Sequence, residues 1–151
     1  MVVSLLSMTG YLPLCYHLPV DLRHIADFNL YAGWCGFLAG VVSGATIGLF
    51  FHRDEWMGGY DSFRRRMIRL GHISFFGLGI LNVLFGLTLG AASFAGDWIP
   101  AASRCMVVGA ITMPACCFLS AWRKPFRHWF FIPVASLLAG VVILLVSWRH
   151  S

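Results

Sequence analysis

The chain has 151 residues, of which 59% are hydrophobic and only 11% are charged. Soluble domains carry about 25% charged residues, so the composition excludes an ordinary soluble domain and indicates a protein of the lipid bilayer. The formal net charge is +5. The basic residues do not form a stripe with interleaved aromatic residues, so the sequence does not favour a nucleic-acid partner.

The first 28 residues are apolar but irregular in pattern. They lack a basic start and contain Pro13 and Pro19, so we expect neither a signal peptide nor an additional span. Met8 is an alternative start. The interpretation is an irregular apolar segment, residues 1–28, lying on the outer membrane interface.

Four long apolar runs follow this segment. A helix needs about 20 apolar residues to cross the hydrocarbon core of a bilayer, and the sequence offers four such runs, at 29–51, 70–94, 99–121 and 129–147. The prediction is an all-α integral membrane protein. Its transmembrane domain, residues 29–147, is a four-helix bundle, and residues 148–151 form a short outer tail.

The distribution of basic residues predicts the orientation of these spans. Eight of the 11 Lys and Arg residues fall in the connections 52–69 and 122–128, whereas the turn between the second and third runs has none. The positive-inside rule assigns such connections to the cytoplasm. We therefore expect both termini outside, in a bacterial inner membrane.

Small residues recur at helical spacing in the first two runs. Each glycine costs a water-exposed helix about 1 kcal/mol relative to alanine, but between membrane helices small residues permit close backbone contact. We therefore predict two helix-packing faces that meet inside the monomer, and a homodimer through the first run is the alternative. The first face comprises Gly36, Gly40, Gly44 and Gly48, and the second comprises Gly79, Asn82, Gly86 and Gly90.

Three histidines are expected at one level near the cytoplasmic surface. His72 lies inside the second run, and His52 and His128 lie at the ends of the first and fourth. Two such imidazoles are suitable axial ligands for a b-type haem. With the carboxylates of Asp54 and Glu55 they are also suitable for a non-haem metal. The simpler interpretation is an interfacial anchor, so we expect no cofactor and keep haem b as the alternative.

The sequence contains no nucleophile elbow, phosphate loop or HExxH pair, which favours a protein that is not an enzyme. The five cysteines form no CxxC pair and are interpreted as free thiols. The expected function is a structural or accessory subunit of a larger membrane complex, with a respiratory complex as one candidate. Its partners are then the lipid bilayer and other membrane subunits. The alternative is an electron-transfer protein that binds haem or quinol, with His72 as a ligand.

Overall fold

The computed structural model describes residues 19–94 and 97–148, and within these ranges the chain is helical without strands. This confirms the predicted all-α class for the described residues. Four long helices are joined by loops and two short 3-10 segments. They are α1 (Val20–Phe51), η2 (Trp56–Gly58), α2 (Phe63–Ala91), α3 (Ile99–Trp122), η3 (Lys124–Phe130) and α4 (Phe131–Ser147).

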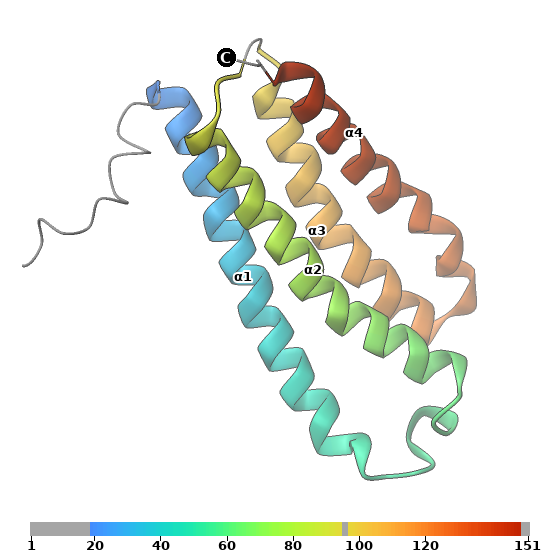
Figure 1. The fold of residues 1–151 in the computed structure, drawn as a ribbon. Coiled ribbons are helices and arrows are strands. Elements are labelled where there is room, and N and C mark those ends of the chain that lie inside the picture. Colours follow the sequence, from blue (N-terminus) through green and yellow to red (C-terminus); the bar gives the residue numbers. More distant parts are fainter. Residues whose placement is uncertain (1–18, 95–96, 149–151) are drawn as a thin grey trace, which may run out of the picture.

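Each of the four helical regions is long and apolar enough to cross a membrane. The helices follow one another across Figure 1 from α1 to α4. The extensive contacts join α1 to α2, α2 to α3 and α3 to α4, and a smaller contact joins α1 to α3. In the described part of the chain α1 and α4 are therefore two flanks that do not close onto each other, and both expose broad apolar surfaces.

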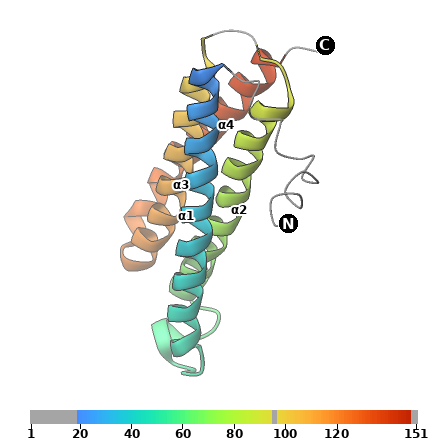
Figure 2. The same cartoon turned by 90° about the vertical axis from the view of Figure 1, so that its left-hand side faces the viewer.

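The best-buried side chains gather near the end of the molecule where α1 begins. The hydrophobic core there comprises Ala26, Phe85, Leu89, Ile99, Ala102 and Met106. Partly buried side chains of α4, among them Leu137, Ile143 and Leu144, pack against this core. All four helices are thus joined most firmly at one end, while the other end carries the two longer connections (Figures 1 and 2).

The first helix begins at Val20, nine residues before the start of the predicted span. The expectation of an irregular segment is therefore wrong for residues 20–28, whereas residues 1–18 lie outside the described residues. The extra turns carry charged side chains, which lowered their hydropathy below that of a span. They are nevertheless amphipathic, and Ala26 and Asn29 are buried against the neighbouring helices.

The second helix also begins earlier than predicted, at Phe63 instead of residue 70. Ser62 is its N-cap, because the Ser62 hydroxyl accepts a hydrogen bond from the backbone N–H of Arg65 (3.2 Å), which satisfies one of the free donors at a helix start. Three successive arginines, Arg64, Arg65 and Arg66, consequently lie in the first turn. The start of α2 lies at the same end of the molecule as η3 (Figure 1), and Arg64 lines a cavity there together with Lys124 of η3.

Candidate functional site

His72 lies between α1 and α2, where it is half-buried. Its ring faces Gly44, so closely that a Cβ added to Gly44 would lie 2.6 Å from the ring. A hydrogen bond of 3.1 Å joins His72 Nδ1 to the hydroxyl of Ser43, and Phe76 packs edge-on against the imidazole. The residue singled out as a ligand is thus also part of the contact between two helices.

The hydrogen bonds of Ser43 suggest which nitrogen of His72 carries the proton. A serine hydroxyl has one hydrogen, and Ser43 donates it to the carbonyl oxygen of Gly40 (3.0 Å). In this arrangement the Ser43 oxygen accepts from Nδ1–H of His72, and Nε2 keeps its lone pair.

The structure does not bring His52 and His128 to His72. His52 follows the end of α1, eight residues beyond the Gly44 that touches His72, and eight residues of helix rise about 12 Å. His128 lies in η3 beside Lys124 and Arg127. Both side chains are exposed. Within the two described ranges, no cluster of three His, Cys, Asp or Glu residues has the geometry to hold a metal ion.

The glycine face of α1 rests on α2, with two differences from the predicted set. A Cβ added to Gly36 would lie 3.2 Å from the carbonyl oxygen of Phe75, and one added to Gly40 would lie 2.7 Å from the ring of Phe76. At Gly48 it would meet nothing within 4 Å. Gly33, which the fourfold spacing did not include, makes the closest backbone contact, with an added Cβ 2.7 Å from the carbonyl oxygen of Gly79.

On α2 the small face continues this contact along the helix. A Cβ added to Gly79 would lie 3.0 Å from the carbonyl oxygen of Gly33, and one added to Gly86 would lie 2.8 Å from the carbonyl oxygen of Ala26. Gly90 is half-buried near the end of the helix. Asn82, by contrast, is completely buried and turns toward α3, where it donates to the carbonyl oxygen of Met106 (3.5 Å).

Asn29 is a second completely buried carboxamide, and sequence reasoning missed it. Its Nδ2 donates to the hydroxyl of Ser103 on α3 (2.5 Å). Ser103 and Met106 are three residues apart and share one face of α3, so Asn29 and Asn82 attach α1 and α2 to the same surface. The polar character of Asn29 at the edge of an apolar run was the available signal.

Arg65, in the first turn of α2, is buried, with an exposed fraction of only 3%. Its guanidinium donates to the carbonyl oxygen of Arg53. It also lies over the rings of Phe51 and Trp56, at 5.4 and 5.5 Å from their centroids, an arrangement typical of cation–π contacts. Arg64, Arg65 and Arg66 could not be distinguished from the sequence. Of these three, Arg65 is the one whose contacts join the start of α2 to the end of α1 and to the loop that follows it.

The described cysteines are free thiols, and Cys15 lies outside the described residues. Cys116 and Cys117 are both buried in α3. The thiol of Cys116 approaches the carbonyl oxygen of Trp129, with a sulfur–oxygen distance of 3.8 Å. This contact ties η3 to the end of α3.

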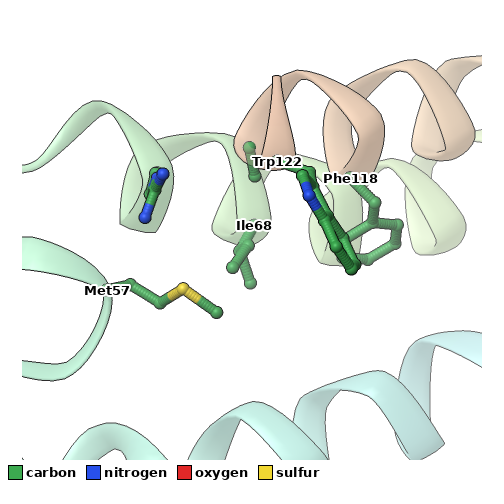
Figure 3. Close-up of a pocket in the computed structure, with 6 residues that line it drawn as sticks. Met57, Ile68, Phe118 and Trp122 are labelled. Carbon is green, nitrogen blue, oxygen red and sulfur yellow. The ribbon is translucent and has the colours of Figure 1, made fainter. Parts of the chain in front are cut away.

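Two neighbouring cavities open at the end that carries the arginines. The first, of about 440 Å³, has walls from the loop, α2 and α3. Figure 3 shows Met57 from the loop facing Ile68, with Phe118 and Trp122 closing one side. The second cavity shares part of this wall and reaches Ser62 and Lys124. Basic side chains and apolar surface thus line the same hollow at this end of the molecule.

The fold and these contacts define a class, that of a small helical protein with four candidate membrane-spanning helices. Comparison with protein-family models, with curated proteins and with solved structures gives no match.

Proposed function

We propose that the chain is an integral membrane protein that serves as a structural or accessory subunit of a larger membrane complex. A bacterial inner membrane, with a respiratory complex as one candidate host, fits this role. The arginine-bearing connections face the cytoplasm, because eight of the 11 basic residues lie in them and positive loops are retained on that side. Both termini are then outside.

The observation that carries the proposal is the free face of α1. Tyr31, Trp34 and Leu38 follow one another at helical spacing and are 72%, 65% and 65% exposed. Trp34 lies inside the apolar part of α1, and its edge-to-face contact with Phe37 (5.4 Å between centroids) orients the ring. Among the described residues, its indole N–H has no hydrogen-bond acceptor.

A neighbouring subunit can supply a hydrogen-bond acceptor for the indole N–H of Trp34, which the lipid hydrocarbon cannot. Hydrocarbon offers no acceptor for an indole N–H, and a buried tryptophan usually finds a hydrogen-bond partner for its N–H at a protein contact. A partner helix with a carbonyl or hydroxyl at this depth satisfies Trp34 and covers Tyr31 and Leu38. The face of α1 opposite α2 is therefore the proposed docking surface for another membrane subunit.

Photo-crosslinking in native membranes tests this docking surface. A photoreactive amino acid at Leu38 on α1 is compared with one at Leu138, which is equally exposed (63%) on α4. We expect a discrete crosslinked partner from position 38 that is reduced by Trp34→Ala and is absent from position 138. Equal crosslinking at both positions, or insensitivity to Trp34→Ala, would contradict the docking role. Crosslinks only to a second copy would establish the homodimer instead.

The orientation is tested separately with a thiol reagent that does not cross the membrane. In intact cells we expect labelling of Ser151→Cys and protection of Asp61→Cys until the membrane is broken. The reverse pattern would contradict the cytoplasmic assignment of the arginine-bearing end.

Haem or quinol binding is the second candidate function, and one feature of His72 favours it. A ligating histidine usually donates its other ring N–H to a protein acceptor, and Ser43 is placed to accept from Nδ1. A visible spectrum of the purified protein tests haem binding, and identification of the small molecules that copurify with it tests quinol binding. A Soret band that disappears in His72→Ala would replace the accessory role, and His52→Ala and His128→Ala would then identify a second axial ligand. A colourless protein from which no quinone copurifies supports the accessory role.

A further inference from the structure

The cleft at the arginine-bearing end is amphiphilic. Its apolar wall consists of Met57, Ile68, Phe118 and Trp122, and Arg64 lies at its edge. Figure 3 shows that the labelled apolar side chains converge on one opening from the loop, α2 and α3. A hollow with an apolar interior and a cationic edge fits a molecule that has an apolar part and an anionic part.

The cationic edge continues into the adjoining cavity of about 350 Å³. That cavity is lined by Arg64 and Lys124, from α2 and η3, and by Ser62 at the start of α2. In the described part of the chain neither Arg64 nor Lys124 has a carboxylate partner. The first turn of a helix disfavours cations, since the helix dipole is positive there. An anion held at this edge relieves the repulsion of Arg64 by its own helix.

The apolar part of the cleft continues toward the middle of the molecule. Phe118 lines the cleft and also a separate apolar groove, of about 400 Å³, that lies between α1 and α3. Phe75 lines this groove as well, and its ring centroid is 6.0 Å from that of Phe118. The two hollows thus meet at the ring of Phe118.

The length of this path matches one leaflet of a bilayer. Arg64, Ile68 and Phe75 lie on one face of α2, and the 11 residues from Arg64 to Phe75 rise about 16 Å along the helix. Half of a hydrocarbon core of roughly 30 Å is about 15 Å. A chain that enters beside Arg64 therefore reaches the groove between α1 and α3 at the depth where an acyl chain ends.

We propose that this cleft is a binding site for one anionic phospholipid of the cytoplasmic leaflet. Arg64 and Lys124 bind its phosphate, and an acyl chain lies against Ile68 and Phe118. The inference rests on the membrane insertion proposed above and is independent of the accessory role. The depth of the apolar path favours a lipid over a free phosphate, and the two unpaired cations favour an anionic headgroup over a zwitterionic one.

Lipid binding to the purified full-length protein tests the headgroup site. Native mass spectrometry in detergent is used to titrate phosphatidylglycerol against phosphatidylcholine with the same acyl chains. We expect preferential binding of one phosphatidylglycerol, weakened about fivefold by either Arg64→Gln or Lys124→Gln, as for removal of one basic residue from an anionic surface. Arg66→Gln is the matched control, because Arg66 is an exposed arginine of the same turn that does not line the cleft.

The acyl-chain half of the site is tested with the water-soluble headgroup alone. Glycerophosphoglycerol, which lacks acyl chains, is expected not to displace the lipid, and Trp122→Ala is expected to weaken binding because it removes one exposed wall of the cleft. Displacement by the headgroup alone, unchanged affinity in Arg64→Gln and Lys124→Gln, or an equal loss in Arg66→Gln would each overturn the proposal. Failure of membrane insertion is detected independently, by extraction of the chain from membranes with alkaline carbonate.

Discussion

The contact between α1 and α2 and the contact between α3 and α4 use glycine in different ways. In the first half of α1, the glycines of the first contact lie against backbone atoms of α2: a Cβ added to Gly33 would lie 2.7 Å from the carbonyl oxygen of Gly79. In the second contact, glycine meets side chains. An added Cβ at Gly109 would lie 2.5 Å from Leu137. One at Gly140 would lie 3.0 Å from the sulfur of Met106, which is nearer than the closest backbone atom, the carbonyl oxygen of Ala102 at 3.2 Å.

This difference determines how each contact can respond to added volume. Two helix backbones in contact move only as whole helices, whereas a leucine or methionine side chain can change its rotamer. In lipid, where close packing drives association, the first contact is therefore the more exacting. The second tolerates substitution if its side chains have room to move.

The largest expected effect is that of Gly33→Ala. The added methyl group separates the backbones of α1 and α2, and we expect a loss of about 2 kcal/mol, within the range for overpacked cores. Thermal unfolding in detergent, followed by circular dichroism, measures the change. Gly48→Ala is the matched control on the same helix: its Cβ meets nothing, so stability should rise slightly through helix propensity. Equal effects at the two positions would refute the proposed backbone contact.

An intermediate effect is expected for Gly109→Ala, about 1 kcal/mol, because Leu137 can shift by changing its rotamer. The double variant Gly109→Ala with Leu137→Ala is the informative measurement. If the cost at Gly109 comes from contact with Leu137, the two substitutions should be non-additive in the same unfolding assay, since residues in contact couple. Strict additivity would show that α4 itself, and not Leu137, resists the methyl group.

The smallest effects are expected from the hydroxyl groups that link the helices. Ser43→Ala removes the partner of His72 on the α1–α2 contact, and Ser136→Ala removes the bond to the Cys105 carbonyl oxygen (2.7 Å) on the α3–α4 contact. Hydrogen bonds between membrane helices average about 0.6 kcal/mol, so both variants should unfold within a few degrees of wild type. A much larger loss for Ser43→Ala alone would indicate that His72 orientation, and not glycine packing, holds α1 to α2.

Hydropathy was sufficient to predict four apolar helices, because that property depends on local composition. It misplaced the helix starts for a physical reason. The first turns of α1 and α2 carry charged side chains such as Asp21 and Arg64, which hydropathy assigns to loops. Their helical state depends on burial of Ala26 and on the cap formed by Ser62.

Fourfold spacing identified a glycine face but not its register against the partner helix. A spacing rule selects Gly48 as readily as Gly40, and only the crossing of α1 over α2 leaves Gly48 uncovered and brings Gly33 into contact. The amphiphilic cleft was beyond sequence reasoning for the same reason. Met57, Ile68 and Trp122 are distant in sequence, and the fold alone makes them neighbours.

The two flanks of the molecule also differ in length. The apolar part of α1, residues 28–51, is about 36 Å long. The 17 residues of α4 alone are about 26 Å long, and the fourth candidate span, Lys124–Ser147, is completed by the 3-10 segment η3. A hydrocarbon core of roughly 30 Å is shorter than α1, which fits it with tilt or local deformation, and longer than α4, which needs part of η3 to cross it. In a membrane the continuous helix α1 would therefore tilt or thicken the lipid beside it, whereas the junction of η3 and α4 would set how deep the fourth span lies, so that local membrane thickness would influence which neighbours each flank meets.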